Sequence, residues 1–200
     1  MKHIYNENKK GAPVFVLLHG TGGTEHDLLP LAGMLDPEYN VLSVRGNVSE
    51  NGMNRYFRRH GEGQYDVEDL NFRGKELHDF IVEASNDYGF DLHDVIFVGF
   101  SNGSNIAINM MLREDTDYRK AILFAPLYPV AVEHEKDLSG AEIFLSMGKN
   151  DPMAPEEESK RVVDLFKSRG ADVAITWVNG HSLPQEAAMK AKEWLKGEAK

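Results

Sequence analysis

Short apolar runs recur along the chain and are typical of buried strands. Residues 14–18, Val-Phe-Val-Leu-Leu, form a continuous apolar run that ends at His19-Gly20. A run of this kind predicts a strand buried on both faces, as the central strands of a parallel sheet are. Comparable runs predict five more strands, at residues 40–44, 95–100, 121–124, 142–146 and 173–178.

Stretches with helical periodicity separate these runs. Within residues 72–88 the apolar side chains fall on one stripe, which predicts a helix with one buried face. Residues 106–112, 156–168 and 183–195 predict three further helices. Strands that alternate with helices predict an α/β fold, with a mainly parallel sheet flanked by helices. Because no internal repeat or low-complexity linker interrupts the 200 residues, we expect one domain over residues 1–200.

Two predicted connections, residues 46–71 and 126–140, are longer than the few residues that usually join such elements. Long loops on a scaffold of this type are more often functional than idle. Neither connection is long enough to form a large lid domain, so we expect none.

Composition and charge narrow the classes of function. The chain is 42% hydrophobic, enough for one substantial core, and its formal charge of −10 disfavours nucleic acid and membranes as partners. It contains no cysteine, which excludes a disulfide framework, a thiolate metal site and a cysteine nucleophile. No run approaches the ~18 apolar residues of a membrane helix, and the first residues lack the apolar region of a signal peptide. We therefore expect a cytoplasmic protein.

The strongest motif is Gly99-Phe100-Ser101-Asn102-Gly103, between a predicted strand and a predicted helix. The pattern G-x-S-x-G in that context predicts a sharp turn that exposes the serine hydroxyl at the C-terminal edge of the sheet. The N-terminus of the following helix directs backbone N–H groups at developing negative charge. We interpret Ser101 as a catalytic nucleophile; the alternative is a chance Gly/Ser turn.

A serine nucleophile needs a base, and the base needs an acid that fixes its tautomer. On this scaffold the acid and then the histidine follow the serine. His181 lies in a loop after the last predicted strand, whereas His134 lies in a charged stretch and is interpreted as a solvated loop residue. Asp151 follows the strand at 142–146 and is the predicted acid; the glutamates at 156–158 are better explained as acids of a first helical turn.

The loop His19-Gly20-Thr21-Gly22-Gly23 follows the first predicted strand and is a candidate oxyanion hole. Glycines let the backbone approach a substrate oxygen closely, and we expect the N–H groups of Thr21 and Asn102 to be the donors. A phosphate loop is the alternative, but the G-x-x-x-x-G-K-[ST] pattern is missing. His19 precedes the serine, so we expect it to stabilise the loop through hydrogen bonds. No H-E-x-x-H spacing occurs, which disfavours a zinc hydrolase.

These segments resemble the phospholipase/carboxylesterase family of α/β-hydrolases, which includes the acyl-protein thioesterases. The resemblance covers nearly the whole chain: residues 18–23 resemble the family's oxyanion loop, 99–103 its nucleophile turn, and 148–152 and 180–181 its acid and base segments. Residues 51–59, continued by 65–70, are similar to bacterial carboxylesterases associated with hydroquinone and catechol stress. Family members often carry Gln where this chain has Asn102, and this departure affects the expected acyl-chain preference.

The resemblance implies an α/β-hydrolase fold, hydrolysis of short-chain esters without a cofactor or metal, and a cytoplasmic location, and it allows a homodimer. It also implies that the loop residues Arg55, Tyr56, Phe57, Arg58 and Arg59 lie near the site, and that Gly22, Arg55, Tyr56 and Phe57 bind the substrate. The residues alone equally allow a packed, salt-bridged loop around 55–59.

Two other functions stay open at this level. One is an acyl-protein thioesterase or lysophospholipase acting on longer acyl chains, which would need a deep apolar channel. The other is a non-catalytic binding protein on a hydrolase scaffold, because a fold does not fix a function. An intact Ser-Asp-His set in the expected order argues against the second alternative.

Overall fold

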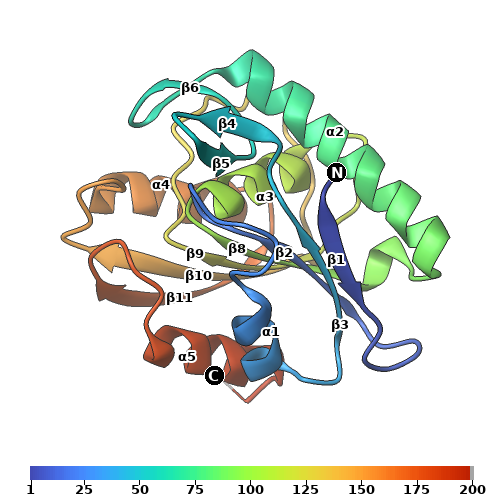
Figure 1. Ribbon diagram of the computed structural model, residues 1–200. Coiled ribbons are helices and arrows are strands. Elements are labelled where there is room, and N and C mark those ends of the chain that lie inside the picture. Colours follow the sequence, from blue (N-terminus) through green and yellow to red (C-terminus); the bar gives the residue numbers. More distant parts are fainter. Residues whose placement is uncertain (199–200) are drawn as a thin grey trace.

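The computed structural model describes residues 1–198. Its centre is a twisted seven-stranded sheet with helices on both faces (Figure 1). The strands lie in the order β1-β3-β2-β8-β9-β10-β11, and β1 is antiparallel to β3 whereas the other pairs are parallel. Their bounds are β1 His3–Asn6, β2 Val14–Leu18, β3 Asn40–Val44, β8 Val95–Phe100, β9 Lys120–Phe124, β10 Glu142–Lys149 and β11 Asp172–Asn179. The predicted α/β fold is confirmed.

Helices cover the two faces of the sheet unequally. One face carries α2, α3 and α4, and the other carries α1 and α5, which pack against each other (Figure 1). Their bounds are α1 Leu29–Leu35, α2 Val67–Tyr88, α3 Asn102–Leu112, α4 Glu156–Lys167 and α5 Gln185–Leu195, with a short 3-10 helix at Leu92–Asp94. Within residues 1–198, no helix combines the length and apolar content needed to cross a membrane.

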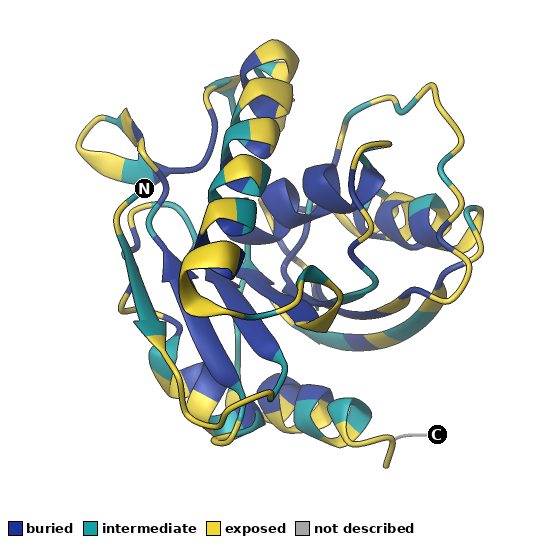
Figure 2. Ribbon diagram, turned by 90° about the vertical axis from the view of Figure 1, so that its right-hand side faces the viewer, coloured by how far each residue is buried: buried dark blue, intermediate teal, exposed yellow. Residues whose placement is uncertain are grey.

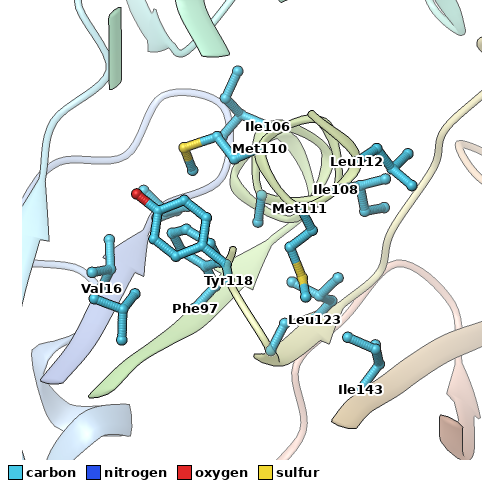
Figure 3. Close-up of a cluster of buried hydrophobic side chains, with 14 of the residues drawn as sticks. Val16, Phe97, Ile106, Ile108, Met110, Met111, Leu112, Tyr118, Leu123 and Ile143 are labelled. Carbon is cyan, nitrogen blue, oxygen red and sulfur yellow. The ribbon is translucent and has the colours of Figure 1, made fainter. Parts of the chain in front are cut away.

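Helix α3 is the central element of the larger core. Every one of its residues is buried, and Figure 2 shows it dark blue along its length beside the half-exposed α2. Figure 3 shows side chains of α3, among them Met110 and Met111, over Phe97 of β8 and Leu123 of β9. Burying each such side chain contributes roughly 1.5–3 kcal/mol to stability. Ser101, which precedes α3, is therefore attached to a firmly packed helix.

Most predicted elements are present, with shifted ends. The strand predicted at 142–146 continues to Lys149, and α2 begins at Val67 instead of residue 72, because the Asp66 side chain caps it by accepting from the Asp69 N–H at 3.0 Å. Strand β1 and helix α1 were not predicted, since both are short and β1 is an edge strand with no fully buried residue.

The two long connections differ in structure. Residues 126–140 contain no helix or strand, as expected. Residues 46–71 instead form two short hairpins, β4 (Val48–Glu50) with β5 (Met53–Arg55), and β6 (Arg59–Gly61) with β7 (Gln64–Tyr65), followed by the first turn of α2. No large lid domain is present within residues 1–198. The assignment of residues 1–200 to one domain stays a prediction.

The parallel strands place several loops at one edge of the sheet. The segments that follow β2, β8, β9, β10 and β11 all leave from the C-terminal ends of adjacent strands. Ligands of α/β proteins bind outside this edge, so these loops are where a site is expected.

Candidate active site

Ser101 occupies a strained turn between β8 and α3. Its backbone has φ 51° and ψ −115°, a conformation that non-glycine residues rarely adopt, and its N–H is held by the Phe124 carbonyl at 2.9 Å. The neighbouring glycines are required by close approach. A Cβ at position 99 would lie 2.7 Å from the Ser104 nitrogen, and one at position 103 would collide with the Leu18 carbonyl.

Three side chains from different loops form one hydrogen-bonded chain. The Ser101 hydroxyl lies 2.9 Å from His181 Nε2, and His181 Nδ1 lies 2.7 Å from Asp151 Oδ2. Because an ionised carboxylate only accepts, Nδ1 carries the proton and Nε2 presents its lone pair to the serine. The side chain of Asp151 is fully buried, and that of His181 is 18% exposed.

The second oxygen of Asp151 fixes the carboxylate in place. Oδ1 accepts from the backbone N–H groups of Met153 at 2.8 Å and Ala154 at 3.1 Å. Both donors lie in the loop before α4, whose first turn contains the glutamates at 156–158, as the sequence predicted. His134 is exposed, donates from Nε2 to the Leu112 carbonyl at 2.6 Å, and does not join the three side chains.

Thr21 and Asn102, the two predicted oxyanion donors, lie in the same pocket wall as Ser101. Neither backbone N–H has an acceptor within residues 1–198. Gly22 was predicted to lie near the substrate, but it is not part of the pocket wall. Its N–H donates to the Asn54 carbonyl at 2.8 Å, and its φ of 85° is one that glycine adopts readily, so Gly22 stabilises the turn of this loop.

The loop of residues 19–23, the candidate oxyanion loop, is fixed by a buried network. His19 Nε2 accepts from the Gly46 N–H at 3.0 Å, so Nδ1 carries the proton and donates to the Gly20 carbonyl at 2.6 Å. Burial lowers the pKa of His19, which keeps the ring neutral in this arrangement. The expected loop-stabilising contacts of His19 are therefore present.

Tyr56 connects three parts of the site. Its hydroxyl accepts from the His19 N–H at 3.0 Å and donates to the Val44 carbonyl at 2.6 Å, while its own N–H donates to Asn102 Oδ1 at 2.8 Å. Tyr56 and Phe57 are fully buried and lie outside the pocket wall. Both residues were predicted to lie near the substrate; their side chains are turned inward behind the pocket wall, where they support the site.

A buried ion pair lies next to this network. Glu25 accepts from Arg45 Nε at 2.5 Å and from Nη2 at 3.1 Å, and its side chain is 3% exposed. Burial acts to raise the pKa of Glu25, but its own backbone N–H and the hydrogen bond and charge of Arg45 outweigh burial and lower that pKa to about 2.

The pocket at Ser101 is small, about 400 Å³ with its mouth included. Of the loop residues predicted to lie near the site, Arg55 and Arg59 are in its wall, whereas Arg58 is not. The wall consists of Thr21, Arg55, Arg59, Glu62, Gly63, Tyr65, Ser101, Asn102, Asn105, Ala125, Leu127, Met153 and His181. Within residues 1–198, no three His, Asp or Glu side chains gather as a metal site requires.

Sequence reasoning missed several wall residues, of which Asn105 is the most informative. Asn105 Nδ2 donates to the Tyr65 hydroxyl at 2.7 Å, and its Oδ1 accepts from the Leu127 N–H at 2.8 Å. It therefore joins both long loops to α3. Its position four residues after Ser101, one helical turn further along the same face, was the available signal.

Comparisons with known proteins agree with this geometry. Residues 1–198 match the model of the Phospholipase/Carboxylesterase family. The chain is 43% identical over 197 residues to "Putative hydrolase MhqD" of Bacillus subtilis (strain 168), covering 98% of each chain.

Solved structures give the same result. The Bacillus cereus carboxylesterase is 44% identical with a TM-score of 0.96, covering 99% of this chain and 94% of that one. YahD, whose structure was solved with malic acid, is 32% identical with a TM-score of 0.94, covering 98% of each chain. A family match over residues 1–198, together with relatives of this identity and coverage, shows that the chain belongs to the phospholipase/carboxylesterase family of α/β-hydrolases.

Proposed function

We propose that this hydrolase is a carboxylesterase that cleaves small, short-chain esters through Ser101, His181 and Asp151. The observation that carries the proposal is the continuous hydrogen-bonded chain from the Asp151 carboxylate through His181 to the Ser101 hydroxyl. The family and the carboxylesterase of Bacillus cereus, 44% identical to this chain, support the reaction class.

In this mechanism Ser101 Oγ attacks the ester carbonyl carbon while His181 Nε2 takes the hydroxyl proton. The Thr21 and Asn102 N–H groups bind the oxyanion, and one such donor is worth roughly 3–4 kcal/mol of transition-state stabilisation. His181 then gives its proton to the leaving alkoxide oxygen, which leaves an acyl-enzyme. Water attacks that ester with His181 again as base, and the carboxylic acid and free Ser101 are released.

The role of Asp151 is to fix the tautomer of His181 and to stabilise the imidazolium that forms. Its backbone donors, the N–H groups of Met153 and Ala154, require an oxygen at Oδ1. In Asp151→Asn the amide oxygen must take that place, so the amide NH₂ faces His181 Nδ1. Nε2 then carries the proton and has no lone pair for Ser101.

The size of the pocket supports short acyl groups. Its volume of about 400 Å³ includes the open mouth, and its wall contains polar and charged side chains beside Ala125, Leu127 and Met153. A thioesterase or lysophospholipase acting on long chains would need an extended apolar channel, and the small, partly polar pocket at Ser101 favours short chains over that alternative.

A chain-length series of p-nitrophenyl esters tests the proposal. We expect kcat/KM to be highest for acetate to butyrate and to fall steeply for octanoate and palmitate, with Ser101→Ala reduced to the background rate for every ester. A maximum at palmitate would favour the thioesterase or lysophospholipase alternative. Absence of turnover for all esters by folded wild type would contradict the esterase proposal.

A further inference from the structure

The guanidinium of Arg55 lies in the pocket wall, and no proton-transfer step of the proposed mechanism uses it. The residue ends β5, is 3% exposed and lines the same pocket as Ser101. Its orientation is fixed on three sides. Nη1 donates to Thr21 Oγ1 at 2.6 Å, Nε donates to the Phe57 carbonyl at 3.2 Å, and the group lies over the Phe57 ring at 5.6 Å from its centroid.

No carboxylate neutralises this cation at contact distance. Within residues 1–198, no Asp or Glu oxygen lies within 4.0 Å of an Arg55 nitrogen, and Nη2 makes no hydrogen bond. The neighbouring Glu50 is occupied by Arg59, which donates to it three times at 2.9–3.2 Å. Glu62 also lines the pocket but is exposed to water, which screens its charge.

An unpaired charge held in a buried place is costly, and an anionic ligand removes that cost. Burial and then the positive charge of Arg59 lower the pKa of Arg55, and the charge of Glu50, which does not contact Arg55, offsets them only in part. An arginine remains protonated at any physiological pH. The planar guanidinium, whose Nη2 makes no hydrogen bond, can donate N–H groups to the oxygens of a carboxylate.

We propose that Arg55 binds a carboxylate of the substrate, so that the preferred esters carry a second, free carboxylate, as half-esters of short dicarboxylic acids do. This inference rests on the esterase function proposed above. The distance between the two groups is constrained by Thr21, which offers its N–H to the oxyanion while its hydroxyl contacts Arg55. The anion site therefore adjoins the oxyanion site, and a spacer of a few carbons is favoured.

The preference comes from local contacts and not from long-range attraction. The chain has a formal charge of −10, so its overall field repels an anionic ester. Recognition must then arise at the guanidinium itself, through charged hydrogen bonds to its N–H groups.

The test compares monoethyl succinate with ethyl succinamate, which have nearly the same size and differ in one charge. Hydrolysis is followed at pH 7.5 by proton release. A hydrogen bond to a charged group changes an affinity by roughly 10- to 100-fold. We therefore expect the kcat/KM of wild type to be about 10- to 100-fold higher for monoethyl succinate than for ethyl succinamate. Equal kcat/KM for the two esters in wild type would overturn the inference.

Variants separate recognition from support of the oxyanion loop. Arg55→Met keeps the side-chain length without the charge and should bring the ratio of the two kcat/KM values to about 1, whereas Arg55→Lys should keep part of it. Arg58→Met is the matched control, because Arg58 is 63% exposed, contacts Asp66 and Asp69 and is not in the pocket wall. Its ratio should equal that of wild type.

A purely supporting role gives a different pattern. If Arg55 only holds Thr21, Arg55→Met lowers kcat/KM for both esters by the same factor, and the inference is overturned. Thr21→Val removes the hydroxyl that contacts Arg55 but keeps the backbone N–H. It should lower both rates and keep a preference for the succinate ester, reduced because the guanidinium loses one of its three contacts.

Binding to Ser101→Ala, measured by calorimetry, distinguishes failure of this inference from failure of the proposed function. Tighter binding of monoethyl succinate than of ethyl succinamate, lost in Ser101→Ala/Arg55→Met, supports the anion site even if wild type hydrolyses no ester. Turnover of p-nitrophenyl acetate without any such discrimination leaves the esterase in place and overturns the anion site.

Discussion

Replacing Glu25 with glutamine perturbs the buried ion pair beside the oxyanion loop. Glu25 accepts two hydrogen bonds from Arg45, and its charge also faces Lys2 at 3.5 Å and His26 at 3.6 Å. Glutamine keeps the size of the side chain and removes the charge. It also leaves the Arg45 guanidinium, which is 27% exposed, without its anionic partner.

The size of the effect follows from the pKa of Glu25, which the folded structure lowers from 4.5 to about 2. A carboxyl whose folded pKa is lowered stabilises the protein above the unfolded pKa, and this contribution is lost as the pH falls toward the folded pKa. At about 1.4 kcal/mol per pH unit, the contribution is about 3 kcal/mol at pH 7 and about 1 kcal/mol at pH 3. For a chain of this length, Glu25→Gln should lower Tm by roughly 6–12 °C at pH 7.

Urea denaturation of wild type and variant at pH 7, 5, 4 and 3 measures this contribution as a difference in unfolding free energy. Titrating groups that do not interact with Glu25 cancel in that difference. Glu38→Gln is the control, because Glu38 and Lys9 form an exposed ion pair at 3.1 Å that should contribute less than about 1 kcal/mol. A Glu25→Gln effect below about 1 kcal/mol at pH 7, or one that is the same at pH 7 and pH 3, would refute the reasoning.

Three further predictions concern the site and its supports. Tyr56→Phe removes a hydroxyl that makes two buried hydrogen bonds, so the free energy of unfolding should fall by about 1–3 kcal/mol in urea denaturation; an unchanged value would contradict the network. Gly103→Ala should abolish the native thermal transition, because the new Cβ would meet two carbonyl oxygens. Gly33→Ala in α1 has open space around the new Cβ and should raise the free energy of unfolding by about 0.5–1 kcal/mol. Equal effects of the two substitutions on Tm would show that close approach does not explain Gly103. Asp151→Asn should reduce kcat by roughly 10⁴-fold with KM little changed, and a loss below about tenfold would show that the histidine tautomer is not controlled by this residue.

The central strands and the three hydrogen-bonded side chains were accessible to sequence reasoning for a physical reason. A strand buried on both faces, such as β2, must be apolar throughout, and that leaves a plain pattern. The chain order of Ser101, Asp151 and His181 follows from which strand ends are adjacent in the sheet. The apolar pattern can be seen in a short stretch of sequence, and the chain order is a general property of this fold.

The long connection at residues 46–71 was not predictable in the same way. Its hairpins are short, and their positions depend on contacts with distant residues, such as that of Tyr56 with His19 and Asn102. Aromatic residues near a site can either line it or support it from behind. Only the path of the backbone decides between these, and here it buries Tyr56 and Phe57 while leaving Arg55 at the pocket.

The most direct test of the account is fluorophosphonate labelling of the folded wild-type chain, with the modified residue located by peptide mass spectrometry. The hydrogen bond from Ser101 to His181 predicts one label per chain, on Ser101, and none on Ser101→Ala. A wild-type chain that takes up no label, or takes it up on another residue, would contradict the assignment of Ser101 as the nucleophile.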